Sequence, residues 1–186
     1  MVKEQMTPEG FIRVKIAEFK TALRSIPDLP PDTVRFIHDY LDEKYTKQDA
    51  EFVLGLMCDY YKVPRPKIMT YTEARDYVRN GGPGWEAVRD ELVYDTLAFI
   101  NTTYRGQIDG ADAIILKDEL LDESMKDLLP EALLHEFYHW LFSLASPSLP
   151  PPLLEAWSRK MYNIEQKLVS IRVENIFTLA GRYLQG

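Results

Sequence analysis

Hydrophobic residues in the first third of the chain recur at spacings of three and four, the period of a helix that buries one face. The first helix is expected from Thr7-Pro8, a typical helix start, to the residue before Pro27. The second follows the Pro30-Pro31-Asp32 break, and the third opens at Thr46–Asp49, which resembles a capping box, and stops at Val63–Pro66. The expected inward positions follow this period: Ile12, Ile16, Phe19, Leu23 and Ile26, then Val34, Ile37, Tyr40 or Leu41 and Tyr45, then Phe52, Val53, Leu56, Met57 and Tyr60.

The period changes in the middle third, where short runs of β-forming residues are separated by turn residues. Strands are expected at 67–71, within 97–104 and at 113–116. Asp109-Gly110 lies between the last two strands and is a two-residue hairpin signal, so these strands are expected to pair antiparallel. The pattern predicts an α+β fold that is predominantly helical, with a small antiparallel or mixed three-stranded sheet.

A short helix over 73–79, with Thr72 as its cap, is expected after the first strand. A chain of 186 residues is long enough to bury a substantial core, so one compact domain is the expectation. Within it, residues 1–62 form an N-terminal helical segment and residues 63–186 form the remaining core.

The segment 133–142, LLHEFYHWLF, carries the candidate chemistry. On a helix, His135 and His139 project from the same face, about 6 Å apart at the backbone, close enough to share one tetrahedral metal. Glu136 lies beside that face and can take a proton from a metal-activated water and pass it to a leaving amine. Two histidines on a helix can also be hydrogen-bonded core residues, but the bulky uncharged residues around this pair favour a metal helix within the core.

A catalytic zinc site typically has three protein ligands, so two histidines leave one ligand to be found. Position 145 is Ala, and the remaining histidine, His38, is expected at the surface or at a helix cap. A carboxylate on the following helix is therefore expected, from Glu155, Glu165 or Glu174. Chain geometry favours Glu155, with Glu165 as the alternative, because a returning helix brings its early turns level with the histidines.

Composition excludes several other classes of protein. The chain has 22 Lys and Arg against 29 Asp and Glu, a net charge of −7, and no dense basic run, which argues against a nucleic-acid surface. Its N-terminus lacks the pattern of a signal peptide, and no stretch approaches the length of a membrane span, so a cytoplasmic protein without a membrane partner is expected. The single Cys58 lies in an apolar helix and is expected to pack in the core.

With HEFYH and a glutamate-bearing helix after it, the chain resembles the gluzincin metallopeptidases, and most of all the small ImmA/IrrE-like and minigluzincin proteins. The run Leu149–Ala156 is similar to the start of the glutamate helix in such proteins. The resemblance implies a zincin-like core over 63–186, with the sheet packed on the HExxH helix. It also implies zinc at His135 and His139, Glu136 as the general base and Glu155 as the third ligand.

The same resemblance implies a zinc metallopeptidase that hydrolyses peptide bonds in a peptide or protein substrate. The strand at 113–116 would be the edge of the sheet and would hold an extended peptide by backbone pairing. Tyr162 is the expected donor to the oxyanion. Two alternatives remain: an ImmA-like regulatory or partner-binding metalloprotein with one target, for which residues 1–62 would be the partner surface, and a structural protein with a fortuitous HExxH.

Overall fold

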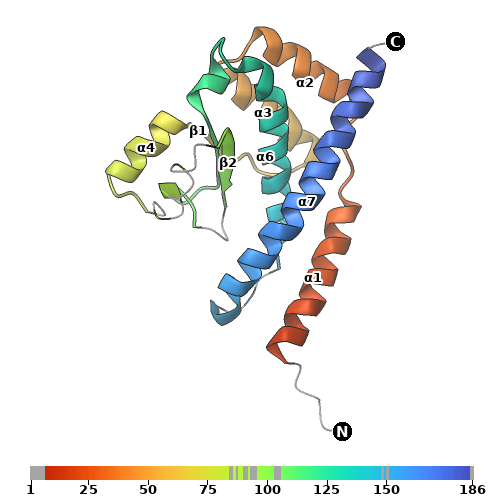
Figure 1. Cartoon of the computed structure of the whole chain (residues 1–186), viewed down its shortest axis with the longest axis vertical. Helices are drawn as coiled ribbons and strands as arrows, with labels where there is room; N and C mark the ends of the chain where they lie inside the picture. The colour runs from red at the N-terminus through yellow and green to blue at the C-terminus, as the bar shows by residue number, and fades with distance from the viewer. Residues whose placement is uncertain are drawn as a thin grey trace.

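The computed structural model describes the backbone of residues 7–83, 86, 88–89, 92, 96–102, 106–147, 149 and 151–184 (Figure 1). Several side chains near the two ends of the last helix, including that of Glu155, lie outside the description. The described elements are α1 (Pro8–Ser25), α2 (Pro31–Glu43), α3 (Lys47–Tyr61), β1 (Lys67–Thr70), α4 (Tyr71–Arg79), β2 (Ala98–Asn101), β3 (Ala113–Leu116), the short 3₁₀ turns η1 (Asp118–Leu121) and η2 (Lys126–Leu128), α6 (Leu129–Ser143) and α7 (Pro151–Leu184). The chain is mostly helical with one small mixed sheet, so the predicted α+β class is confirmed.

The sheet has the strand order β1-β3-β2. β2 pairs antiparallel with β3, with Phe99 opposite Ile115, as the hairpin signal predicted. Asp109 and Gly110 form the turn between them with φ values of 49° and 72°, the left-handed conformation that such a turn requires. β1 pairs parallel with the other side of β3. The expectation that 113–116 is the sheet edge is therefore wrong, because β3 is flanked on both sides and β2 is the outer strand next to it.

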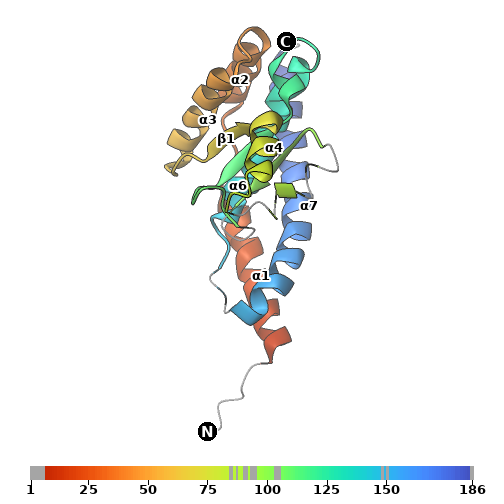
Figure 2. The ribbon, with the colours of Figure 1, turned by 90° about the vertical axis from the view of Figure 1, so that its left-hand side faces the viewer.

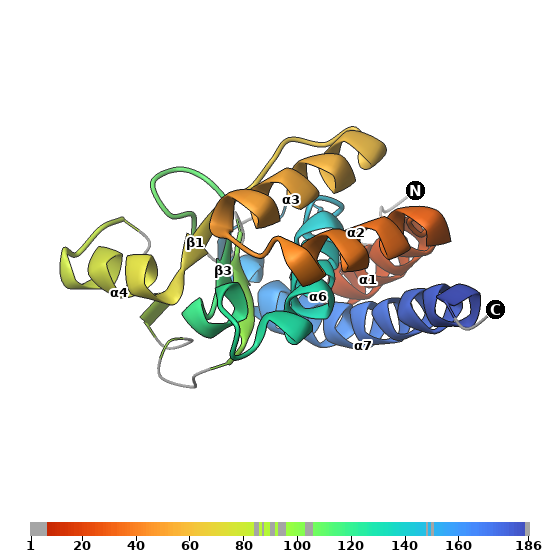
Figure 3. The ribbon, with the colours of Figure 1, turned by 90° about the horizontal axis from the view of Figure 1, so that it is seen from above.

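The sheet lies between α4 on one face and α6 on the other (Figure 3). Successive strand residues alternate between these layers, as the pleat requires. In β3, for example, Ile114 and Leu116 join the main core around α6, whereas Ile115 packs with Tyr71 of α4. All four residues of β3 are buried, which explains why its sequence reads as a continuous apolar run.

The first three helices confirm the predicted boundaries to within a few residues. Thr7 caps α1, and the capping box of Thr46 and Asp49 opens α3. The inward face of α3 was predicted wrongly in part, because Phe52 and Tyr60 are about half exposed. Smaller residues fit the core side of α3, where Ala50, Leu54 and Cys58 join Val53 and Met57, and the ring of Phe52 instead lies 5.1 Å from that of Tyr40.

The cap of α4 also differs from the prediction. Thr70, not Thr72, is the N-cap, since its hydroxyl accepts from the backbone N–H of Glu73 and Glu73 returns a bond to the N–H of Thr70. This capping box needs a glutamate three residues after the cap, and Glu73 has that spacing from Thr70. The backbone N–H of Thr72 instead donates to Asp118.

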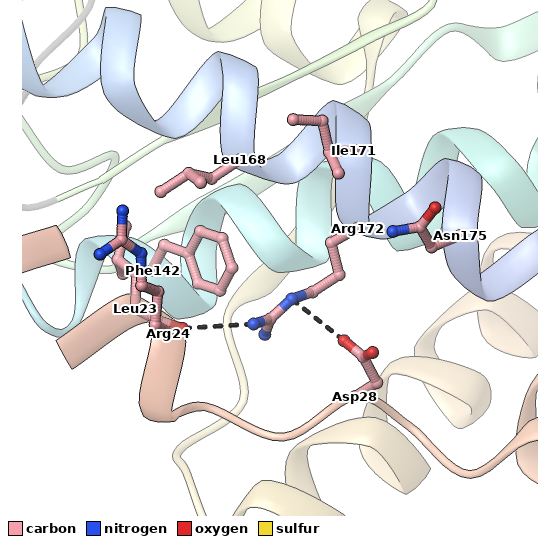
Figure 4. Close-up of a pocket in the computed structure, with 8 residues that line it drawn as sticks. All are labelled: Leu23, Arg24, Asp28, Phe142, Leu168, Ile171, Arg172 and Asn175. Atoms are coloured by element: carbon pink, nitrogen blue, oxygen red, sulfur yellow. Dashed lines mark hydrogen bonds and ion pairs between the residues drawn. The ribbon is translucent and has the colours of Figure 1, made fainter. Parts of the chain in front are cut away.

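α1 lies alongside α7, whose C-terminal part extends beyond it (Figures 1 and 2). Phe19 meets Trp157 edge to face, with ring centroids 5.8 Å apart. Arg172 of α7 donates to the carbonyl of Leu23 at 3.2 Å and pairs with Asp28 at 3.1 Å, beside a cavity of about 240 Å³ (Figure 4). Residues of the 1–62 segment thus share one hydrophobic core with α6 and α7.

Among the described residues, no helix combines the length and apolar character needed to cross a membrane.

Candidate active site

α6 is the central helix of the core, and its sequence explains its burial. Pro130 stands in the first turn, where its missing N–H costs nothing, and Glu131 in the same turn complements the positive end of the helix dipole. Almost every later residue is buried, including Glu136 at 8% exposure and His139 at 4%. Burial of charged or polar groups at this level is costly unless they are paired, so the burial of these two side chains calls for a structural or functional reason.

The two predicted histidines point toward one another. Their Nε2 atoms lie 3.1 Å apart and their ring centroids 4.8 Å apart. Two nitrogens bound to one tetrahedral zinc at roughly 2 Å are about 3.3 Å apart, so the pair fits a shared zinc ion. Burial lowers the pKa of His135, which favours the neutral imidazole that ligates metals. The same separation allows a hydrogen bond from one ring to the other, and a metal would replace that proton.

Three cavities meet at His135, and we call them together the groove. The first, of about 570 Å³, lies between α6 and β2 and includes Leu97, Leu128 and Ala132. The second, of about 210 Å³, includes Glu136, His139 and residues of both β2 and α7. The third, of about 430 Å³, opens between α6 and α7. Glu136, the residue that the sequence suggested as a general base, lines the first two cavities together with His135.

α7 forms one wall of the groove with residues spaced four apart. These wall residues are Tyr162, Gln166, Ser170, Glu174 and Thr178. The ring of Tyr162 is nearly parallel to that of His139, with an interplanar angle of 11° and ring centroids 6.4 Å apart. Ser170 lines a cavity together with His135. The two helices therefore run antiparallel past one another, and the stretch 162–170 of α7 lies level with the two histidines.

This register separates the candidates for a third ligand. Glu165 falls within the level stretch and is fully buried, in a stripe with Met161 and Val169. Glu155 lies seven residues before Tyr162, about 10 Å further along the helix axis and beyond His139. His139 is four residues from the end of α6 at Ser143, but Tyr162 is eleven residues into α7, so the returning helix comes level later than the sequence geometry assumed.

As the side chains stand, no group of three or more His, Cys, Asp or Glu residues within the described part of the chain is placed to hold a metal. Glu174 lines the groove with His135 but at its far end. His38 lies on α2, about half exposed and 3.8 Å from Asp39, the surface position that was predicted. Tyr162, the predicted oxyanion donor, lies at the groove with 43% of its surface exposed.

Several groove residues were missed from the sequence. Thr96 and Ala98 of the β2 segment line two of the cavities, and Gln166 and Ser170 line the α7 wall. A usable signal was present in α7, since 162, 166, 170, 174 and 178 are polar or aromatic at the four-residue spacing of one helix face. The contribution of β2 had no such signal, because it depends on strand order.

Comparison of the chain with protein families, with curated proteins and with solved structures finds no match.

Proposed function

We propose that the protein is a zinc-dependent peptidase with a zincin-like core, and that His135, Glu136 and His139 are its catalytic centre. The observation that carries the proposal is the convergence of the two Nε2 atoms at 3.1 Å on a buried helix, with Glu136 in the same cavity. A catalytic zinc differs from a structural one in keeping an open position, and the groove provides the space for a substrate there.

His135 and His139 are the proposed first two ligands. Glu165 is the proposed third, because it lies level with them and is fully buried, whereas the sequence alone favoured Glu155. A buried carboxylate is stabilised when it ligates a cation, so a metal would offset the cost of burying Glu165. Zinc bound by these residues would supply a Lewis acid that polarises a carbonyl and lowers the pKa of water toward 7.

Glu136 acts in this proposal as the proton carrier. Glu136 is almost fully buried and lines, with His135, the cavity that a scissile bond would enter. It accepts the proton of the attacking water and delivers it to the leaving amine. Tyr162, whose ring centroid is 6.4 Å from that of His139, is the proposed donor to the developing oxyanion.

β2 is the proposed guide for the substrate backbone. It is the outer strand beside β3, and Ala98 and Ile100 line the cavity that contains both histidines. An extended peptide can add to such a strand through main-chain hydrogen bonds, which would hold its carbonyl groups along the groove. The sequence suggested the strand at 113–116 for this role, but that strand is the central one of the sheet.

The test is zinc content together with one substitution. Purified wild type should hold about one zinc per chain and cleave a pool of fluorogenic peptides. Glu136→Gln should keep the zinc and lose roughly 10²- to 10⁴-fold in kcat/KM, the usual contribution of a general base. The matched control is Glu51→Gln, on the exposed side of α3, which should leave the rate unchanged.

Absence of bound zinc after loading, or a Glu136→Gln protein as fast as wild type, would contradict the proposal. A protein that binds zinc through the histidines but cleaves no peptide would support the alternative, a partner-binding metalloprotein with one target. The zinc measurement and the rate measurement therefore separate these two functions.

A further inference from the structure

The charged side chains that line the groove in the described part of the chain are all acidic. We propose that the groove selects peptides that carry Lys or Arg, and that Glu131 and Glu174 bind this cationic side chain. The inference rests on the proposed peptidase function, and it names the class of substrate.

Glu131 and Glu174 face the same cavity from opposite helices. Glu131 stands one turn before His135 on α6, and Glu174 stands one turn after Ser170 on α7. Both line the cavity of about 430 Å³ that also contains His135. Both are exposed, and within the described part of the chain neither forms a hydrogen bond or an ion pair with a neighbouring side chain. Their carboxylates are therefore available to a ligand in the groove.

Within the described part of the chain, no positively charged side chain lines the groove. Among the described residues that line its three cavities, the charged side chains are Glu131, Glu136 and Glu174, and none is Lys or Arg. A cleft lined by one sign of charge concentrates ligands of the opposite sign, and a net charge of −7 for the chain acts in the same direction.

The shape of the groove suits a long cationic side chain. Glu131 lines both the cavity that it shares with Glu174 and the larger cavity that includes Leu97, Leu128 and Ala132. Lys and Arg place an apolar stem against such surfaces while the charged end reaches a carboxylate. The cavity of Glu131 and Glu174 includes His135 but not His139. The cationic side chain is therefore expected on one defined side of the scissile bond.

The helix dipole accounts for the acidic character of one of the two glutamates but not of the other. Glu131 is in the first turn of α6, where an acidic residue is favoured by the helix dipole whatever the ligand. Glu174 lies in the second half of α7, far from the helix start at Pro151, and has no such reason to be acidic. Glu174 is therefore the more informative residue to change.

The experiment measures binding to a protein that cannot turn over its ligand. Zinc-loaded Glu136→Gln protein is titrated with three peptide pools that are random except for one fixed central residue, which is Lys, Gln or Glu. The Lys pool should bind about three- to tenfold more tightly than the Gln pool, and the Glu pool more weakly still. Raising the salt concentration should reduce the difference, because exposed charges are screened.

Adding Glu174→Gln should remove most of the preference for Lys, whereas adding Glu51→Gln, at a surface outside the groove, should retain it. Equal binding of the three pools, or an unchanged preference after Glu174→Gln, would overturn the proposal. Because binding is read without catalysis, these results are independent of whether wild type cleaves peptides. A peptidase with no charge preference refutes only the inference about substrate, and a cation-selective groove without cleavage refutes only the peptidase.

Discussion

Tyr138 and His139 are neighbours on α6, but their side chains enter two different regions of the molecule. The hydroxyl of Tyr138 accepts from the backbone N–H of Leu29 at 3.1 Å and lies 2.9 Å from the hydroxyl of Tyr61. Tyr61 in turn donates to the carbonyl of Pro27 at 2.5 Å. We call these groups the tyrosine cluster. His139 instead opens onto the groove, where its neighbours line cavities.

The difference teaches how one helix can serve both stability and chemistry. In the tyrosine cluster, burial raises the pKa of both phenols, and their hydroxyls are engaged by groups of the protein itself. In the groove, burial lowers the pKa of His135, and polar side chains line space that a ligand can fill. The tyrosine cluster ties the loop before α2 to α3 and α6, so it fixes the helix that carries the histidines.

The largest expected effect that separates the two regions is on zinc affinity. Glu165→Gln should weaken zinc binding by at least about 100-fold, because one of three protein ligands is lost. Glu155→Gln should change the affinity less than threefold, since its position on α7 lies beyond His139. Competition with a chromogenic chelator gives both affinities.

The reverse result, a loss on changing Glu155 and none on changing Glu165, would restore the ligand set that the sequence favoured. Thermal unfolding of each variant without zinc checks that folding is unchanged, so that a lost ligand is distinguished from a lost fold.

A smaller effect is expected on stability. Tyr138→Phe removes the acceptor for the N–H of Leu29 inside the protein and should reduce the free energy of unfolding by about 1–3 kcal/mol. Tyr162→Phe is the matched change in the groove, and because Tyr162 is 43% exposed it should cost less than about 0.5 kcal/mol. Urea denaturation of the zinc-free proteins measures both.

If the two tyrosine variants were equally stable, the contrast between a closed and an open side of α6 would be wrong. Tyr138→Phe should retain wild-type zinc affinity once the protein is folded, because Tyr138 is not one of the proposed ligands.

The last effect is seen only at alkaline pH and concerns Cys58, which is buried in the same core cluster as Tyr138. Burial raises the pKa of this thiol from 9.0 to about 11. The unfolded chain therefore releases the proton at lower pH than the folded one, and the stabilisation is complete below pH 9 and is lost as pH rises toward 11. Unfolding curves of wild type should fall more steeply with pH across this window than those of Cys58→Ala. Parallel slopes for the two proteins would show that Cys58 does not titrate differently on folding.

Local signals in the sequence predicted most of the fold. Caps at Thr7 and Thr46 and the turn at Asp109-Gly110 each depend on a few neighbouring residues, and all three are present in the structure. The prediction that 113–116 is an edge strand was wrong because its second partner, β1, lies more than forty residues before β3 in the chain. The prediction of the buried face of α3 was wrong in part because aromatic residues occur on both sides of that helix. Tertiary packing selects the smaller residues for the core.

The histidine pair was predictable for a similar reason, since its geometry lies within one helical turn. The wall of the groove formed by α7 required the register between two helices. That register depends on the path of the connection between Ser143 and Pro151, which no periodic pattern describes. Glu165 was accordingly ranked below Glu155 although it lies level with the histidines.

The contact of Arg172 with Leu23 joins residues 149 apart in the chain. Closing so long a loop costs conformational entropy that a single hydrogen bond cannot return, so α1 can only dock when the whole face of α7 is present to receive it. Ribosomes make α1 long before α7, and its apolar residues Ile12, Phe19 and Leu23 must wait in water until then. Burial of α1 is therefore expected late in folding, after α7 has been synthesised and has packed on the rest of the core.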